Sequence, residues 1–253
     1  MKNELLKVNG LKKCYGEKTV VDDVSYVIET GDIIGLIGPN GAGKSTMIKI
    51  LAGVEDKTAG KVLFQSSQID AQNVEYKKTL GVVPQDIAIY EDLNAYENVM
   101  FFCSLYGFKK QELKQRTKEA LEFVGLWEKR DQLPTKFSGG MKRRLNIACS
   151  IAHSPQLLIM DEPTVGIDPQ SRNHIMESIK KLNQRGTTII YVSHYMEEIE
   201  ELCNRIIIMD HGKIRKDETK VKLKEMYQME NLMTLEDIFL HLTGTKLRDE
   251  EEA

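Results

Sequence analysis

The sequence predicts an α/β fold, in which a mostly parallel sheet with an antiparallel N-terminal β part is combined with an inserted group of helices. Three observations predict it. The apolar run 33–37 leads into a glycine-rich loop and then into a helical pattern. Three helical patterns follow one another between residues 86 and 154. From residue 156 onward, apolar runs alternate with helical patterns, which is typical of a doubly wound parallel sheet.

The N-terminal region contains the predicted antiparallel part. Residues 5–16 and 19–29 alternate between apolar and polar side chains, as strands of a half-buried sheet do. The run 33–37 is predicted to be a buried strand. Residues 58–64 follow a turn as a further strand, and the short apolar run within 79–85 is another.

The loop after residue 37 contains three glycines, Gly38, Gly41 and Gly43, which permit backbone angles that a Cβ would forbid. Several backbone N–H groups can then point at one spot, next to the positive dipole end of the following helix. The spacing G-x-x-x-x-G-K-S is that of a P-loop, in which Lys44 reaches the β- and γ-phosphates and Ser45 places its hydroxyl on Mg²⁺. A flexible glycine-rich turn is the alternative, but the preceding strand and the following helix supply the context that a P-loop needs. The chain is therefore predicted to bind a nucleoside triphosphate.

Composition narrows the possible functions. The 253 residues carry a net charge of −3, which argues against a nucleic-acid-binding protein. The four cysteines are far apart and form no C-x-x-C pair, so they are predicted to be reduced, small apolar residues. Neither a signal peptide nor an apolar run of about 20 residues is predicted, so a membrane-spanning part would have to come from another chain.

Three predicted helices make up a helical subdomain over residues 86–154. They cover residues 94–107, 111–126 and 138–155. Each has a start or stop signal, such as Asn94 at the beginning of the first helix. After this subdomain the strand patterns return.

The C-terminal half alternates between strands and helices. Residues 156–162 form a continuous apolar run, as expected of a parallel strand buried on both faces. A helix over 168–186, a strand over 187–193, a helix over 194–203 and a strand over 205–210 follow, and then a tight turn.

Two carboxylates, Asp161 and Glu162, end the strand that begins at residue 156. In a P-loop enzyme the first would hold Mg²⁺, directly or through water, and the second would orient and deprotonate an attacking water. A solvated acidic turn is the alternative, and the upstream P-loop makes it the weaker one.

The tail from about residue 215 lacks the alternation of apolar strands and helices that precedes it. Residues 216–231 are polar and predict a linker or a solvated helix. Residues 234–244 predict an amphipathic helix that begins with a capping box of Thr234 and Asp237. An acidic, mobile tip is expected at residues 248–253.

The predicted organisation therefore has three parts. They are a nucleotide-binding α/β core of residues 1–85 and 155–215, a helical subdomain of residues 86–154, and a C-terminal helical tail of residues 216–253.

The segment FSGGMKRR, residues 137–144, resembles the signature motif of ATP-binding cassette (ABC) ATPases, which usually reads LSGGQ. The combination of a P-loop, an SGG before a helix, the strand end MDEPT and a histidine after the next strand is specific to that family. The resemblance runs from about Leu6 to Lys213. It implies a P-loop NTPase core that hydrolyses ATP, with ATP and Mg²⁺ as cofactors.

The resemblance implies roles for individual residues. Tyr15 resembles the aromatic residue that stacks on adenine, with an ordinary surface or core tyrosine as the alternative. Gln85 resembles the glutamine that touches Mg²⁺ or the attacking water, and His194 resembles the switch histidine that contacts the γ-phosphate. The segment expected to bind ATP is Gly38, Pro39, Asn40, Gly41, Ala42, Gly43, Lys44, Ser45 and Thr46.

Four further residues resemble those that reach across a head-to-tail dimer of cassettes. Ser138, Gly139 and Gly140 resemble the segment that presses on the γ-phosphate held by the other cassette. A serine hydroxyl and glycine N–H groups at a helix start also make an anion site on physical grounds. Asp168 resembles the aspartate that crosses the dimer interface, and it also fits the cap of the helix that follows.

The signature departs from its usual form at two positions. Phe137 replaces leucine and Met141 replaces glutamine. Methionine packs but cannot donate an amide hydrogen bond, so no role is carried over to Met141. The form with methionine resembles the branch of single-cassette subunits that drive export of drugs, sodium, polysaccharide or lipid-linked cargo.

The resemblance implies two partners: a second ATP-binding cassette, either an identical or a related chain, and a separate transmembrane permease subunit. Nucleic acid is not an expected partner. The expected location is the cytoplasm, peripheral on the inner face of the cell membrane. Two alternatives are an ABC ATPase that acts on ribosomes or DNA, and a regulatory cassette that binds ATP without transport.

Overall fold

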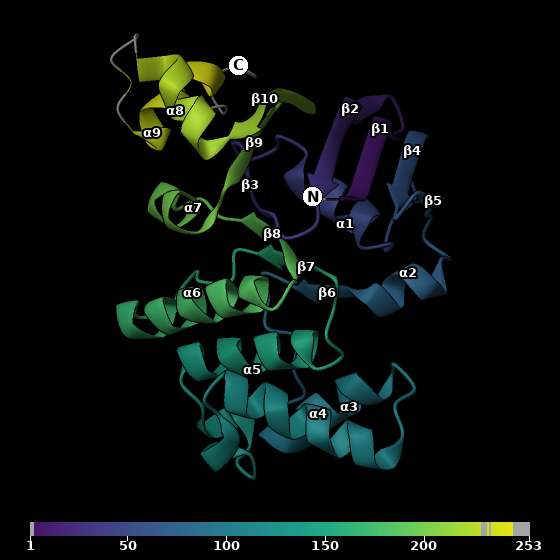
Figure 1. Cartoon of the computed structure of the whole chain (residues 1–253), viewed down its shortest axis with the longest axis vertical. Coiled ribbons are helices and arrows are strands. Elements are labelled where there is room, and N and C mark those ends of the chain that lie inside the picture. Colours follow the sequence, from purple (N-terminus) through teal and green to yellow (C-terminus); the bar gives the residue numbers. More distant parts are fainter. Residues whose placement is uncertain (1–2, 229–231, 233, 245–253) are drawn as a thin grey trace. The chain divides into compact units, whose positions relative to one another are not determined.

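The computed structural model describes residues 3–228, 232 and 234–244 (Figure 1). The chain divides into two compact units. The first consists of residues 1–72 and 193–253, and the second of residues 73–192. Each unit combines strands with helices, so the predicted α/β class is confirmed.

An antiparallel sheet forms the N-terminal part of the first unit, as predicted. Its central strand β1 pairs with β2 on one side and β4 on the other, and the strand order is β2-β1-β4-β5. The strands are β1 (Glu4–Tyr15), β2 (Lys18–Glu29), β4 (Ala59–Phe64) and β5 (Ser67–Gln68). Apolar side chains of β1 and β2, including Leu6, Val8 and Ile28, are fully buried, because alternation places them on the core face.

A second group of strands in the first unit positions the glycine-rich loop. Strand β3 (Ile33–Ile37) is buried along its whole length and runs parallel to β9 (Arg205–Asp210). The loop after β3 leads into α1 (Lys44–Leu51), and α7 (Met196–Leu202) precedes β9.

The prediction for the beginning of the tail is wrong. A strand, β10 (Lys213–Thr219), pairs antiparallel with β9 where the sequence predicts a linker or solvated helix from residue 216. A side-chain pair adds to this backbone pairing: Arg205 Nε and Nη2 each donate to the Asp217 carboxylate at 2.7 Å. The sequence pattern does not reveal this strand, because both of its faces carry charged side chains, as those of edge strands often do.

Two helices complete the described tail, α8 (Lys220–Gln228) and α9 (Leu235–Thr243). Helix α9 begins with the predicted capping box, in which Thr234 and Asp237 bond reciprocally. The predicted acidic tip at residues 248–253 lies outside the described residues.

The second unit contains three parallel strands and most of the helices. Strand β7 pairs with β6 on one side and β8 on the other. The strands are β6 (Leu80–Val83), β7 (Leu157–Asp161) and β8 (Thr188–Val192). The helices are α2 (Val74–Thr79), α3 (Ala95–Ser104), α4 (Lys110–Phe123), α5 (Gly139–Ile151) and α6 (Pro169–Gln184), with 3₁₀ turns at Trp127–Lys129 and Pro134–Lys136.

The three helices predicted between residues 86 and 154 are present as α3, α4 and α5. Their start signals act as predicted: Asn94 forms a capping box with Glu97, and Ser138 caps α5. Asp168 caps α6, with Pro169 at its first position. The short helix α2 is not predicted by the sequence. The division into core, helical subdomain and tail stays a prediction.

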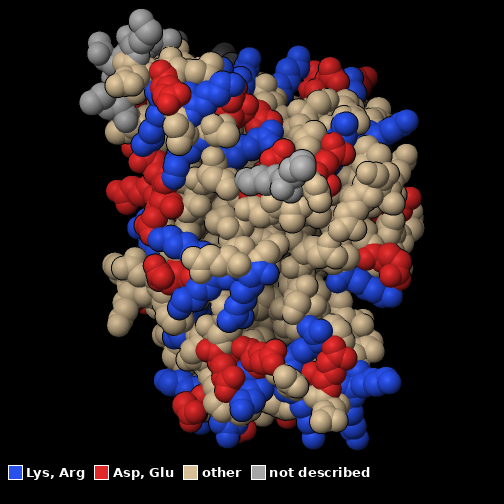
Figure 2. Space-filling model, viewed as in Figure 1, with Lys and Arg blue, Asp and Glu red and all other residues tan. Residues whose placement is uncertain are grey.

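The surface charges and the cysteines are arranged as the composition predicts. On the face shown in Figure 2, positive and negative side chains are interspersed. All four cysteines are free, and three of them are buried. Within the described residues, no helix is both long and apolar enough to cross a membrane.

Candidate active site

The P-loop has the geometry that its sequence predicts. Lys44, the first residue of α1, is buried, and its Nζ donates to the carbonyl oxygens of Gly38 at 2.6 Å and Pro39 at 3.1 Å. The ammonium group is therefore held inside the curve of the loop, where a phosphate group would be bound. An ammonium there, together with the N-terminus of α1, makes an anion site.

Two glycines are required by close packing in this loop. Gly43 has φ +101°, and a Cβ there would lie 2.6 Å from the carbonyl oxygen of Val20. At Gly38 a Cβ would overlap the carbonyl oxygen of Met209. Any side chain at either position would displace the backbone, so the loop depends on glycine for steric reasons.

Tyr15 lies at the end of β1, and its ring is half exposed. Lys13 Nζ lies 4.9 Å from the ring centroid. A hydrogen bond to Glu55 raises the pKa of Tyr15, and Thr46 of α1 also bonds its side chain. The structure thus brings Tyr15 beside the predicted ATP-binding segment and leaves its ring accessible for stacking.

His194 lies in the first unit, close to the loop. It is exposed and lines a cavity of about 310 Å³ together with Pro39 and Asn40. Its neighbour Ser193 is fixed, because the buried Ser193 hydroxyl donates to Glu198 at 2.8 Å. Sequence reasoning missed the Ser193–Glu198 pair, although the two residues lie only five positions apart. The structure therefore brings the predicted switch histidine to the loop that it is predicted to serve.

The second unit brings Gln85 and Glu162 together. Gln85 Nε2 donates to Glu162 Oε2 at 3.2 Å, across 77 residues of sequence. Glu162 follows β7 with φ +47°, a conformation that is uncommon for a residue other than glycine. Its N–H donates to Val192 O of β8 at 2.9 Å, which holds this backbone in place. A strained acidic residue at the carboxyl end of a buried strand is typical of a functional position.

Arg143 fixes the segment that carries Gln85, and sequence reasoning missed it. Its Nη1 donates to Pro84 O at 3.0 Å and its Nη2 to Gln85 O at 2.7 Å. The side chain is buried, and this burial lowers the pKa of its guanidinium group. The run KRR in the signature does not reveal which of its residues turns inward.

The signature residues begin α5. The Ser138 hydroxyl accepts the N–H of Met141 at 3.3 Å, so it still has a hydrogen to donate. Ser138 and Gly139 are exposed, and Gly140 is buried against Ser171 of α6. Asp168 accepts the Ser171 N–H at 2.9 Å, and this bond lowers the pKa of Asp168. The structure therefore places Asp168 at the cap of α6, next to the start of α5.

The residues predicted to bind Mg²⁺ have the appropriate chemistry. Ser45, Gln85 and Asp161 offer a hydroxyl, an amide oxygen and a carboxylate, all hard oxygen ligands. A donor set of a few protein oxygens suits Mg²⁺, which keeps several waters and binds substrate phosphates.

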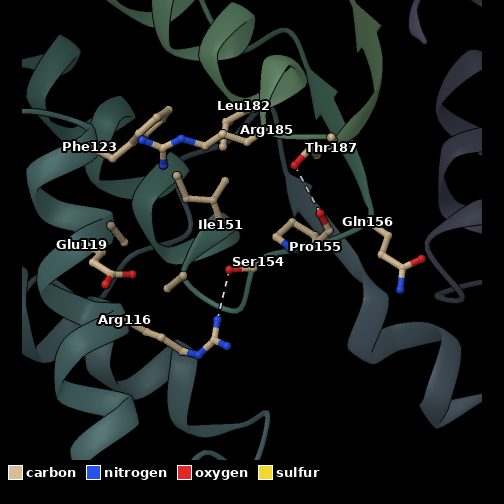
Figure 3. Close-up of a pocket in the computed structure, with 13 residues that line it drawn as sticks. Arg116, Glu119, Phe123, Ile151, Ser154, Pro155, Gln156, Leu182, Arg185 and Thr187 are labelled. Atoms are coloured by element: carbon tan, nitrogen blue, oxygen red, sulfur yellow. Dashed lines mark hydrogen bonds between the residues drawn. The ribbon is translucent and has the colours of Figure 1, made fainter. Parts of the chain in front are cut away.

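A second cavity, of about 340 Å³, lies within the second unit (Figure 3). Arg116 donates to Ser154 Oγ at 3.0 Å at one wall, and Arg185 lies over the Phe123 ring at another. None of the residues predicted to act on ATP lines this cavity. It is therefore separate from the predicted nucleotide and catalytic residues.

Known proteins resemble this chain closely. The ABC transporter family model matches residues 21–165. The linearmycin resistance ATP-binding protein LnrL of Bacillus subtilis is 50% identical over 220 residues, covering 87% of this chain and 70% of the relative. The Nod factor export ATP-binding protein I of a Rhizobium species is 39% identical, covering 84% and 70%. The methionine import ATP-binding protein MetN of Clostridioides difficile is 35% identical, covering 96% and 78%.

Solved structures have the same fold. An ATP-binding subunit of an ABC transporter superposes with a TM-score of 0.84 at 27% identity, covering 94% of this chain and 99% of its own. A dimeric ATP-binding cassette in a post-hydrolysis state, bound to ADP and Pi, superposes with a TM-score of 0.76 at 27% identity, covering 85% and 98%. The family model, the relatives and these structures, together with the P-loop and the Gln85–Glu162 pair, show that the chain belongs to the ABC transporter family as an ATP-binding and ATP-hydrolysing subunit.

Proposed function

We propose that this chain powers an exporter: it hydrolyses ATP on the cytoplasmic face of the cell membrane and drives a separate transmembrane permease subunit. Two of the relatives are named for linearmycin resistance and for Nod factor export. The relative named for methionine import is less similar, at 35% identity against 50%. These names favour export over import.

Nucleotide binding is assigned to the first unit. Tyr15 stacks on the adenine, and the backbone N–H groups of the P-loop surround the phosphates. Lys44 exchanges its bonds to Gly38 O and Pro39 O for bonds to the β- and γ-phosphates, which offer it full negative charges. His194, which lines a cavity together with Pro39 and Asn40, contacts the γ-phosphate.

Catalysis is assigned to the second unit. Glu162 accepts a proton from the attacking water, and the Gln85 amide orients that water. Ser45, Gln85 and Asp161 would hold Mg²⁺, which neutralises charge on the phosphates. The hydrogen bond between Gln85 and Glu162 supports this assignment because it places the two groups at one spot.

A second cassette completes the site. Ser138, Gly139 and Gly140 of one copy donate to the γ-phosphate held by the other, and Asp168 crosses the interface. The solved dimer with ADP and Pi supports a two-fold arrangement. ATP closes this dimer, and hydrolysis removes the group that both copies hold. An identical copy is the simplest partner, and a related second chain is the alternative.

A surface group of aromatic residues is the proposed docking site for the permease. Tyr90, Phe101 and Phe102 touch, with ring centroids 5.1 Å apart for Tyr90–Phe101 and 5.9 Å apart for Tyr90–Phe102. Tyr90 and Phe101 are exposed, as are the nearby Ile87 and Leu105. Exposed apolar groups of this kind mark protein–protein contacts.

The aromatic group is tied to the catalytic residues, and this is the observation that carries the proposal. The buried Asn98 of α3 accepts the Tyr90 N–H at 2.8 Å and donates to Tyr90 O at 2.9 Å. Tyr90 therefore sits at one end of a short segment whose other end, Gln85, bonds Glu162. A permease helix that moves Tyr90 would therefore also move Gln85 and change its contact with the Glu162 carboxylate.

The alternative ABC ATPase that acts on ribosomes or DNA has less support. Its surface would have to attract phosphate backbones, and the net charge here is −3. A regulatory cassette without turnover is also disfavoured, because both Glu162 and His194 are present.

The experiment is co-purification of the Glu162→Gln chain, with ATP, from detergent-solubilised membranes of the source cell. The variant retains ATP, so the closed complex accumulates and an integral-membrane chain is expected in stoichiometric amount. The same chain carrying Tyr90→Ser and Phe101→Ser should lose that partner while still binding ATP. Capture of ribosomes or DNA instead would contradict the exporter and favour the alternative.

A further inference from the structure

The C-terminal helix α9 forms one wall of the cavity next to the P-loop. The cavity, about 310 Å³ in volume, is lined by Pro39 and Asn40 of the loop, by His194 and Met196, and by Glu236, Phe239 and Leu240 of α9. The tail thus reaches the P-loop residues Pro39 and Asn40 and the predicted switch histidine.

The helix is firmly attached in this position. Leu235 and Ile238 on its inner face are fully buried. The Leu235 N–H donates to Glu200 Oε1 at 3.0 Å, and Lys224 of α8 pairs with the same carboxylate at 3.0 Å. The ring of Tyr227 from α8 packs edge-on against His241. The buried side of α9 belongs to the core of the first unit, and its cavity side is a surface.

The cavity side of α9 is partly apolar and open. Leu240 is 39% exposed, and it stands with Phe239 and Met196 around the hollow. Water in a hollow of this kind is released when apolar groups cover it, which favours association. The rim also carries Glu236, which is exposed and negative.

We infer that the outward face of α9, formed by Glu236, Phe239 and Leu240, is part of the interface with a second copy of this chain in the ATP-bound dimer. The inference rests on the proposed head-to-tail dimer, because in that dimer the partner's Ser138–Gly140 segment approaches the loop that Pro39 and Asn40 belong to. Pro39 and Asn40 line the same hollow as the outward face of α9, so a cassette that approaches this loop also approaches α9.

Charge favours a second copy as the occupant. The exposed Lys136 lies two residues ahead of Ser138, whereas Lys142 in the first turn of α5 is already paired with Glu91 at 2.5 Å. The segment that would arrive therefore presents the positive charge of Lys136, and Glu236 gives the rim of the hollow a negative charge. In this arrangement, ATP-dependent closure of the dimer depends on contacts made by α9, although α9 takes no part in ATP hydrolysis.

The test uses the full chain with Glu162→Gln, in which the dimer should persist with ATP. Leu240→Glu is added in one variant and Met226→Glu in another. Met226 is a matched control, because it is an apolar residue of α8 that is 44% exposed and does not line the hollow. Sedimentation velocity with and without ATP gives the dimer dissociation constant, and calorimetric titration gives ATP affinity.

Leu240→Glu should weaken the ATP-bound dimer by at least about tenfold, the scale of a buried interface contact. At protein concentrations at which the chain stays monomeric its ATP affinity should not change, and Met226→Glu should match the parent in both measurements. Equal dimerisation of all three chains, equal weakening by both substitutions, or a tighter dimer with Leu240→Glu would overturn the inference and leave the proposed function standing. A parent that stays monomeric with ATP would overturn the proposed dimer, and the inference with it.

Discussion

The P-loop and the Gln85–Glu162–Arg143 cluster are built in opposite ways. The P-loop is one continuous segment, and its charged group bonds to carbonyls only five and six residues away. The cluster joins three segments, with Glu162 77 residues and Arg143 58 residues from Gln85. A local motif fixes its own geometry through backbone sterics, whereas the cluster exists only when its unit is folded.

The two regions are also assigned to different steps, the P-loop to ATP binding and the cluster to hydrolysis. Damage to the P-loop should remove ATP affinity, since the phosphates are held there. Damage to the cluster should slow hydrolysis and leave affinity intact, since its groups are assigned to the water and not to the nucleotide. Four substitutions test whether binding and turnover are separated in this way.

The largest effect is expected from Glu162→Gln. An amide cannot accept the proton of the attacking water, so turnover should fall by about 10²–10⁴-fold. ATP affinity, measured by calorimetry, should stay within twofold. Glu177→Gln on α6, which changes an exposed carboxylate of the same unit, should have no effect on turnover. Near wild-type turnover in Glu162→Gln would remove Glu162 as the base.

Lys44→Ala tests the P-loop. Charge-assisted hydrogen bonds contribute roughly 1.5–3 kcal/mol each, so loss of this ammonium should weaken ATP binding by at least about a hundredfold. Lys49→Ala is the control, because Lys49 is exposed on the same helix. Calorimetry that shows equal affinities for the two variants would contradict the P-loop assignment.

Arg143→Lys tests whether the cluster depends on positioning. A lysine keeps the charge but cannot supply the two parallel donors that hold Pro84 O and Gln85 O. Turnover should fall by about tenfold with unchanged ATP affinity. The neighbouring Arg144 donates to Val124 O instead, so Arg144→Lys should leave turnover near normal. A loss of ATP affinity in Arg143→Lys would show that the two regions are not separable in this way.

The smallest effect is a pH dependence confined to the second unit. His153 bonds Leu80 O of β6 at 3.0 Å and stacks on Tyr106 at 3.7 Å. Burial lowers the pKa of His153 from 6.5 to about 4, so the folded chain holds it neutral. Its contribution to stability is complete above pH 6.5 and is lost as the pH falls from 6.5 towards 4, because the unfolded chain takes up the proton first.

Denaturant unfolding should show the effect directly. Between pH 7.5 and pH 5.5 the wild type should lose about 1 kcal/mol of unfolding free energy through this group. His153→Phe keeps an aromatic ring against Tyr106 but cannot titrate, so its loss over the same interval should be smaller by that amount. Identical pH profiles for the two chains would contradict the assignment of this pH dependence to His153. ATP affinity is measured alongside, because nucleotide binding is assigned to the first unit.

Much of the fold could be predicted because it is local. Strands β3, β7, β8 and β9 are short apolar runs, and the caps of α3, α5, α6 and α9 consist of residues a few positions apart. The strand β10 could not be predicted, because its pairing is a contact with the neighbouring strand β9 and its own side chains are mostly charged. The periodic pattern of an edge strand with charges on both faces gives no apolar signal.

The P-loop, the carboxylate pair Asp161–Glu162, the SGG helix start and the family to which they belong can all be read from the chain alone. Each of these is a contiguous pattern whose backbone geometry follows from glycine, capping and strand-end rules. Only the tertiary structure decided that Arg143 holds the Gln85 segment, that Asn98 fixes Tyr90, and that α9 walls the cavity beside His194. These contacts join residues far apart in sequence, and a side chain's direction is set by what packs around it, so no spacing in the chain records them.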